Sequence, residues 1–355
     1  MEIKIQDTLI GQQHPTYFIA DIAANHDGDL DRAVDLIRLA KEAGADAAKF
    51  QNFRAPNIVS DYGFKNMGEQ VSHQAEWKES VFEVYSGAAI PFEWTPTLKD
   101  ACDEFDIHYF SSPYDFEAID MLDPYVPAYK AGSGLMSWPQ AIVSMAKKGK
   151  PIIIATGAAD ISEVARIMSM VREVNDQIVL LQCNTNYTAS PDNYDHLHIN
   201  VLKTFAVMYP DVIIGLSDHT HSVAPVLGAV ALGARVIERH FTDDNDREGP
   251  DHKFAMNPEA WAEMVAETRI LERALGSTEK FVAGNEQDTL IVQRRCLRAA
   301  RDISAGEVLS REMIEALRPA TPGAIMPFED EKVIGAKVRT DIPFGKELRW
   351  NDLEV

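Results

Sequence analysis

The chain of 355 residues alternates short, continuously apolar runs with longer segments, and this alternation constrains its fold more than any other feature. Strands that are apolar throughout are buried on both faces, which is typical of parallel sheets covered by helices. Eight runs have the length and composition of such strands, and they cover residues 17–22, 46–50, 107–111, 126–131, 151–156, 178–182, 211–216 and 234–240.

The segments between these runs have the periodicity of amphipathic helices. In residues 30–43 the apolar side chains recur on one face, with Asp29 as the expected N-cap and Gly44 as the expected end. Eight strand–helix units over roughly 260 residues favour a (β/α)8 TIM barrel. A doubly wound open sheet is the alternative, but no Gly-x-Gly-x-x-Gly follows the first strand. Further helices are predicted over residues 93–105, 115–122, 139–148, 160–174, 196–208, 222–233 and 257–275.

One connection, residues 51–92, is far longer than the others. Loops of such length in compact domains are usually functional lids or disordered segments. Because this one contains Phe53, Tyr62, Phe64 and Trp77, we expect an ordered lid.

The pattern changes after residue 276, where a polar stretch leads into a tail that repeats itself. "DISAGEVLSREMIE" (302–315) resembles "DIPFGKELRWNDLE" (341–354), with Asp, Ile, Gly and Leu at matching places. We therefore expect a barrel over 1–278, a linker over 279–290 and a small pseudo-symmetric domain over 291–355.

The net charge of −21 argues against nucleic acid or an anionic membrane as a partner, since nothing general would attract phosphate groups. No basic segment followed by an apolar one opens the chain, and no run approaches the roughly 18 apolar residues of a membrane span. Three separated cysteines, Cys102, Cys183 and Cys296, fit free thiols in a reducing compartment better than disulfides, so we expect a cytoplasmic protein.

Two histidines follow neighbouring strands at equivalent places: His219 in "GLSDHT" and His240 in "ERHFT". Neighbouring strands lie about 4.8 Å apart, so two imidazoles at their carboxyl ends can share one metal ion. Two protein ligands would leave positions for water and substrate, as Lewis-acid catalysis requires. The alternative is a pair of hydrogen-bonded structural histidines.

Lys49 in "AAKFQ" and Lys130 in "AYKAGSG" also end buried strands. A lysine there is costly unless an anion pairs with it. Together with the Gly-Ser-Gly turn, the two lysines indicate a pocket for phosphate or carboxylate. The alternative, for each lysine taken alone, is a salt-bridged structural role. Asp251 and Tyr187 follow later strands and suit a polyol, but equally suit surface loops.

Taken together, these segments resemble the sialic acid synthase family, whose members condense phosphoenolpyruvate with an N-acylated hexosamine to give a nonulosonic acid. The resemblance extends from "IADIAANHDGDLDRAVDLIRLAKEAGADAAKFQ" through "AYKAGSG", "GLSDHT" and "ERHFTDDNDREGPDH" to a tail similar to the antifreeze-protein-like domain, of β-clip type. It implies a (β/α)8 barrel followed by that small domain, and a C–C bond-forming transferase that releases phosphate.

The resemblance also implies roles for particular residues. His219 and His240 would hold a divalent metal, Mn²⁺ or in its place Mg²⁺ or Co²⁺, that polarises the sugar aldehyde. Arg318 matches an arginine that reaches the other subunit's site in a domain-swapped homodimer. Lys49 and Lys130 would serve catalysis with Asp21, and the substrates would contact Gln51, Ser112, Ser133, Thr185, Tyr187, Ser217 and Asp251.

Two positions depart from the family pattern. The family usually has glutamate where Asp21 stands, and it places a carboxylate for proton transfer directly after the Gly-Ser-Gly, where this chain has Leu135. Losing a general acid or base costs about 10²–10⁴-fold in rate. A binding paralogue that no longer condenses its substrates is therefore one alternative, and a metal-dependent TIM-barrel hydrolase is another.

Overall fold

The computed structural model describes residues 1–69 and 71–354 and divides into two compact units, Met1–Gly276 and Ser277–Val355. The first unit contains an eight-stranded sheet in which every paired strand is parallel to its neighbour, in the order β5-β4-β3-β10-β9-β8-β7-β6. Its first and last strands in sequence, β3 and β10, pair with each other, and β5 and β6 at the two ends of this order lie next to each other. The predicted TIM-barrel-like architecture is therefore confirmed, and each predicted run overlaps one strand, although β4, β5, β8 and β9 end one or two residues later than predicted. The strands are Tyr17–Asp21 (β3), Ala47–Asn52 (β4), His108–Pro113 (β5), Tyr129–Ala131 (β6), Ile152–Ala155 (β7), Ile178–Cys183 (β8), Ile213–Asp218 (β9) and Val236–His240 (β10).

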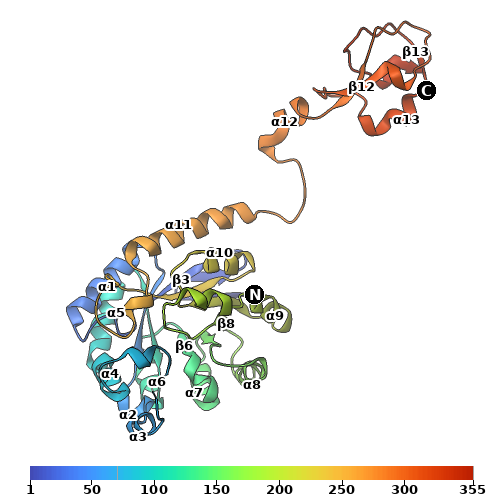
Figure 1. The fold of residues 1–355 in the computed structure, drawn as a ribbon. Coiled ribbons are helices and arrows are strands. Elements are labelled where there is room, and N and C mark those ends of the chain that lie inside the picture. The colour runs from blue at the N-terminus through green and yellow to red at the C-terminus, as the bar shows by residue number, and fades with distance from the viewer. Residues whose placement is uncertain (70, 355) are drawn as a thin grey trace. The chain divides into compact units, whose positions relative to one another are not determined.

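Helices follow the strands and lie around the sheet (Figure 1). Helix α1 begins as expected, because the Asp29 side chain accepts hydrogen bonds from the backbone of Asp31 and Arg32. The helix predicted from residue 196 begins only at Val201, since a 3-10 turn, Pro191–His196, precedes it. The helices are Leu30–Glu42 (α1), Thr95–Glu104 (α5), Phe116–Leu122 (α6), Pro139–Ala146 (α7), Ile161–Arg172 (α8), Val201–Met208 (α9), Ala224–Ala231 (α10) and Pro258–Leu275 (α11).

An N-terminal hairpin, Glu2–Ile5 (β1) and Thr8–Gly11 (β2), was not predicted from the sequence. Its buried residues Ile3, Ile5 and Ile10 pack in one cluster with interior side chains of the barrel. Several of those side chains, such as Tyr17 and Val236, begin their strands. The hairpin therefore covers the amino ends of the strands, and the open end of the barrel is the carboxyl end.

The 51–92 segment is built of short helices: Ala55–Ile58 (α2), Asp61–Lys65 (α3) and Val81–Ala88 (α4), with a 3-10 turn at Ser72–Glu76. Residue 70 lies outside the described residues. The aromatic residues Phe64, Trp77 and Tyr85 pack with Val81 in a small apolar cluster of the segment's own. Burying these rings gives the segment its helical order.

The C-terminal unit confirms the internal repeat. Ile303 and Ile342, equivalent in the two copies, exchange both backbone hydrogen bonds at 2.9 and 2.8 Å. The Asp302 side chain accepts from the backbone of Phe344 and the equivalent Asp341 accepts from Ala305, both at 2.8 Å. The two copies therefore pair about a local pseudo-twofold axis. The elements of this unit are Gln287–Val292 (α12), Cys296–Ala299 (β11), Ile314–Leu317 (β12), Asp330–Val333 (α13), Lys337–Val338 (β13) and Leu353–Glu354 (β14).

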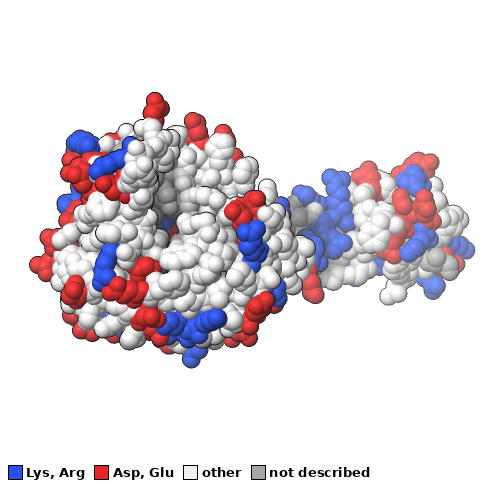
Figure 2. Space-filling model, turned by 90° about the horizontal axis from the view of Figure 1, so that it is seen from below, with Lys and Arg blue, Asp and Glu red and all other residues white. Residues whose placement is uncertain are grey.

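Within the described residues, no helix combines the length and the apolar character needed to cross a membrane. Acidic side chains are scattered over the face of the barrel unit drawn in Figure 2, around a central hollow.

Candidate active site

A cavity of about 410 Å³ opens at the carboxyl ends of the barrel strands. Six strands contribute side chains to it, and the 3-10 turn Ser133–Ser137 after β6 forms part of its wall. The barrel strands supply Asp21, Lys49, Gln51, Lys130, Cys183, Ser217, Glu238 and His240 to its lining, and His219 follows β9 directly.

Two buried ion pairs lie at the floor of this cavity. Lys49 Nζ lies 2.5 Å from Asp21 Oδ2, and Lys130 Nζ lies 3.2 Å from Glu238 Oε1. All four residues are at most 4% exposed. Asp21 and Lys49 are in register on neighbouring strands, so their side chains point the same way. Each buried lysine is therefore paired with a carboxylate, which offsets the free-energy cost of burying its charge.

Glu238 was missed by the sequence analysis. It stands two residues before His240 on β10, and alternate residues of a strand face the same side, so the "ERH" spacing was the signal. Its Oε1 accepts from Ser217 Oγ at 3.2 Å, whereas Oε2 is buried without a hydrogen-bond partner among the described residues.

The two carboxyl groups differ in proton affinity. Burial raises the pKa of Asp21, and Lys49 does not fully offset this, since the negative Glu238 adds to it. Burial also acts to raise the pKa of Glu238, but Lys130 and Lys49 outweigh it and hold that pKa below the ordinary value. Of the two carboxyl groups, Asp21 is therefore the easier to protonate and Glu238 the harder.

His219 and His240 face each other with ring centroids 5.4 Å apart. His219 Nδ1 lies 2.8 Å from the carbonyl of Asn184 and donates to it, so Nε2 is the ring nitrogen that can act as a ligand. Burial acts to lower the pKa of His219, but its contacts with Cys183 and with the Asn184 carbonyl outweigh burial and raise that pKa. His240 Nδ1 is buried without a hydrogen-bond partner within the described chain, and its Nε2 lies 3.6 Å from Asp21 Oδ2. Burial, followed by the positive charges of His219, Lys49 and Lys130, holds the pKa of His240 well below its usual range. A neutral imidazole with an unpartnered nitrogen is the form that binds metal.

The protein supplies few ligands for such a metal. No three His, Cys, Asp or Glu side chains among residues 1–69 and 71–354 are grouped to hold one. A cation held by this histidine pair would therefore take its other ligands from water or substrate. The residues present fit a catalytic metal of that kind, and do not fit a closed structural site.

Aromatic rings pack against both histidines. Tyr187 lies 4.5 Å from His219 between ring centroids, and Phe254 lies 4.8 Å from His240. Tyr187, predicted to contact the sugar, therefore also forms one wall of the histidine pair.

The other predicted polar residues hydrogen-bond around the lysines. Gln51 Nε2 donates to Asp21 Oδ2 at 3.2 Å, and Ser112 Oγ lies 3.5 Å from Lys49 Nζ. Ser133 Oγ accepts the backbone N–H of Gly157 at 3.1 Å. Leu135, buried in the same turn, lines the cavity with an apolar side chain at the departure noted above.

Thr185 is placed differently from the expectation, because β8 ends at Cys183 and the strand alternation does not continue beyond it. Thr185 lines a separate cavity of about 780 Å³ together with Asn184 and Asn186, and it is absent from the lining of the lysine cavity. Arg318 belongs to the C-terminal unit, where it is exposed directly after β12.

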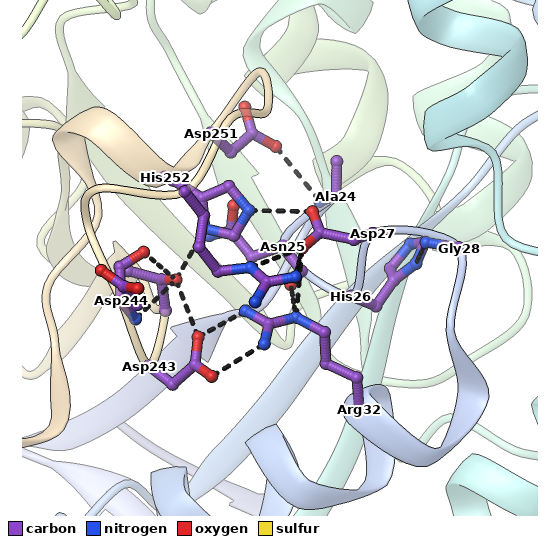
Figure 3. A network of polar contacts seen from close by, with 12 residues as sticks. Ala24, Asn25, His26, Asp27, Gly28, Arg32, Asp243, Asp244, Asp251 and His252 are labelled. Atoms are coloured by element: carbon purple, nitrogen blue, oxygen red, sulfur yellow. Dashed lines mark hydrogen bonds and ion pairs between the residues drawn. The ribbon is translucent and has the colours of Figure 1, made fainter.

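Asp251 lines a smaller cavity of about 140 Å³, which Gln51, Tyr187 and His240 also line. A polar network between the loops that follow β3 and β10 holds Asp251 there (Figure 3). Its Oδ2 accepts the backbone N–H of Ala24 at 3.2 Å. The next residue, His252, donates from Nε2 to Asp27 Oδ1 at 2.9 Å, and Arg247 Nε donates to Asp27 Oδ2 at 2.8 Å. Burial raises the pKa of Asp251 to about 6, only partly offset by the Ala24 hydrogen bond.

Comparison with known proteins identifies the family. Residues 36–280 match the NeuB family and residues 294–354 match the SAF domain. The chain belongs to the NeuB family. The family resemblance and the antifreeze-like domain predicted from the sequence are thereby confirmed.

Relatives in this family are named as synthases of nonulosonic acids. The N,N'-diacetyllegionaminic acid synthase of Legionella pneumophila is 33% identical over 97% of this chain and 96% of that enzyme. The human N-acetylneuraminate-9-phosphate synthase is 31% identical over 93% of this chain and 90% of its own length. The crystal structure of the sialic acid synthetase of Leptospira borgpetersenii, solved with citrate, has a TM-score of 0.71 at 27% identity over 82% of this chain and 95% of that one.

Proposed function

We propose that this NeuB-family protein condenses phosphoenolpyruvate with the open-chain form of an N-acylated hexosamine, such as N-acetylmannosamine, to give a nonulosonic acid and phosphate. The observation that carries the proposal is the convergence of two buried lysine–carboxylate pairs and two histidines on one cavity.

The lysines are the proposed site for phosphoenolpyruvate. Lys49 and Lys130 place two ammonium groups in the cavity beside their carboxylate partners, and they are the proposed cationic donors to the phosphate and carboxylate groups. The backbone of the Ser133–Ser137 turn is proposed to add neutral donors.

The histidine pair is the proposed site for a divalent metal, Mn²⁺, or Mg²⁺ or Co²⁺ in its place. Bound there, the metal would supply a Lewis acid for the sugar aldehyde oxygen. The unpartnered Nδ1 of His240 and the short distance between the two imidazole rings support this assignment. Gln51, Tyr187 and Asp251 border the same region and are proposed to hold the hydroxyl and acyl groups of the sugar.

The proposed reaction forms one carbon–carbon bond. C3 of phosphoenolpyruvate attacks the aldehyde carbon, and positive charge develops at C2. Water adds to C2 and gives up one proton, for which the unpartnered Oε2 of Glu238 is the proposed acceptor. The tetrahedral intermediate then breaks the bond between C2 and the phosphate oxygen, its remaining hydroxyl proton passes to the departing phosphate, and C2 becomes the new carbonyl carbon.

Asp21 is the proposed donor of the proton that the new alkoxide needs. Its raised pKa and its place between Lys49 and His240 support that role. On this proposal Asp21 and Glu238 share the proton transfers, so the carboxylate absent at Leu135 is not required. The alternative, a paralogue that binds without condensing, rests on Leu135 alone.

Phosphate release tests the proposal. The protein is mixed with phosphoenolpyruvate, Mn²⁺ and one N-acyl hexosamine at a time, and phosphate release is compared with that of a mixture without sugar. We expect sugar-dependent release that Glu238→Gln lowers by about 10²-fold or more, while phosphoenolpyruvate still binds. Absence of release with every sugar would instead support the non-condensing paralogue.

A further inference from the structure

Tyr114 stands where the lysine cavity meets the smaller cavity lined by Asp251, and it belongs to the walls of both. It follows β5 directly, so it lies at the carboxyl end of the barrel together with the predicted site residues. Neither the sequence prediction nor the proposed reaction gives this side chain a part.

The two ends of the Tyr114 side chain meet different cavities. Its ring packs edge-on against Phe53 with ring centroids 5.9 Å apart, and Phe53 lines the smaller cavity but not the lysine cavity. Its hydroxyl lies against Gly132, which lines the lysine cavity but not the smaller one. A Cβ atom added to Gly132 would lie 2.9 Å from the hydroxyl oxygen. The hydroxyl is therefore directed to the lysine cavity, at the turn that follows Lys130.

Backbone contacts hold Tyr114 in this place. Its N–H donates to the carbonyl of Asn52 at 3.2 Å. The next residue, Asp115, caps α6 by accepting the N–H of Ala118 at 2.7 Å, and its other oxygen accepts from Asn57 Nδ2 at 2.6 Å. No hydrogen bond engages the Tyr114 hydroxyl itself within residues 1–69 and 71–354. A fixed ring thus presents an unengaged hydroxyl to the cavity.

The hydroxyl keeps its hydrogen at neutral pH. Burial raises the pKa of Tyr114 well above its usual range, and the negative charges of Asp21, Glu238 and Asp251 act in the same direction. A phenol that stays neutral can donate a hydrogen bond to an anion without adding negative charge to the site. Leu135, which lines the same cavity, can offer no such bond.

We propose that Tyr114 is a substrate-binding residue, whose hydroxyl donates a hydrogen bond to an anionic group of the phosphoenolpyruvate held by Lys49 and Lys130. Phosphate and carboxylate are both acceptors of this kind. The inference rests on the proposed function and adds one residue to its phosphoenolpyruvate site. Gly132 belongs to the same arrangement, because a residue without Cβ leaves the hydroxyl its place.

Calorimetric binding of phosphoenolpyruvate, with Mn²⁺ and without sugar, tests the proposal. Tyr114→Phe removes the hydroxyl and keeps the ring against Phe53. We expect the Kd to rise about 10-fold or more, the usual effect of losing a hydrogen bond to a charged group. KM for phosphoenolpyruvate should rise similarly and kcat should change little, since the bond is made in the ground state as well. Tyr62→Phe is the matched control, because it deletes the same hydroxyl from a side chain that is 78% exposed.

Two simpler anions identify the group that the hydroxyl contacts. Inorganic phosphate and pyruvate are each titrated as competitors of phosphoenolpyruvate. If the hydroxyl meets the phosphate group, Tyr114→Phe weakens the binding of inorganic phosphate, and if it meets the carboxylate, the variant weakens the binding of pyruvate. Unchanged affinity for all three anions would overturn the proposal.

A double-mutant cycle with Gly132→Ala separates the hydrogen bond from a general disturbance of the fold. Gly132 has φ −66° and ψ 153°, which alanine adopts without strain. The added methyl group would displace the hydroxyl, whereas the nearest ring carbon, at 3.4 Å, makes an ordinary contact. Gly132→Ala should therefore weaken phosphoenolpyruvate binding in the wild type and add little in Tyr114→Phe. Losses that add in full would mean that the hydroxyl does not bind the substrate.

Failure of this inference and failure of the proposed function can be told apart, because binding is measured without turnover. Phosphoenolpyruvate binding that depends on Tyr114, with no phosphate release for any sugar, overturns the condensation alone. Sugar-dependent release with an unchanged Kd in Tyr114→Phe overturns the role of Tyr114 alone.

Discussion

At the scale of single residues, burial and neighbouring charges set the pKa values of the side chains in the site. Lys49 shows the balance: burial lowers its pKa, but Asp21 and Glu238 outweigh that effect and raise it. The lysine therefore stays charged in a place that water scarcely reaches. Burial has the larger effect on Asp251, where it raises the pKa and so makes the carboxyl group easier to protonate than usual.

The raised pKa of Asp251 predicts a pH dependence for use of the sugar. A carboxyl group with a pKa of about 6 is protonated below that pH and then accepts hydrogen bonds poorly. We expect kcat/KM for the sugar to rise about tenfold per pH unit below pH 6 and to level off above it. Asp251→Asn should remove this limb from the pH profile. A limb that persists in the variant would assign it to another group, such as Asp21.

At the scale of elements, the loops after β3 and β10 act together because their strands are neighbours in the sheet. Asp27 has a left-handed backbone, φ 52°, and receives both His252 and Arg247. His252 is fully buried, and its other nitrogen lies 2.7 Å from Thr242 Oγ1. This arrangement fixes the peptide that carries Asp251, so Asp27 and His252 are positioning residues.

Asp27→Asn tests the positioning. The variant keeps the shape of the side chain but weakens a charge-assisted hydrogen bond, which is worth about 1.5–3 kcal/mol. We expect KM for the sugar to rise by about tenfold, with kcat and KM for phosphoenolpyruvate little changed. Arg38→Ala, which removes an exposed ion pair on α1, is the control. Equal loss of kcat for all substrates, with a lowered melting temperature, would mean that Asp27 serves stability instead.

At the scale of the whole molecule, the barrel and the repeat-containing unit are separate compact bodies. We propose that the protein is a domain-swapped homodimer in which exposed Arg318 completes the site of the other subunit. In such a dimer each active site uses residues from both chains.

Mixing of inactive variants tests this proposal. Arg318→Ala should impair use of the sugar but spare binding of Mn²⁺, and Lys130→Ala should abolish turnover. After subunit exchange, half of the dimers are mixed and each has one intact site, so about a quarter of the wild-type activity should return. Activity that stays at the level of the separate variants would place Arg318 in its own chain's site or outside any site.

The sequence by itself determined the barrel, the repeat and most of the site. Hydrophobic periodicity is a local property of the sequence, so eight apolar runs were enough to predict eight strands. The ends of those strands were then enough to place four side chains in one cavity, those of Lys49, Lys130, His219 and His240. The repeat likewise predicted a pseudo-symmetric domain, and in the structure the equivalent residues Ile303 and Ile342 meet across a pseudo-twofold axis.

Only the tertiary structure decided what depends on contacts between distant segments. The partnership of Glu238 with Lys130 and the turn of the chain that takes Thr185 to another cavity are of this kind. The N-terminal hairpin was missed for the same reason, since its isoleucines find their partners inside the barrel. A repeating pattern specifies the element in which a residue lies and the face it presents, but the neighbour across the cavity is fixed only when the barrel closes.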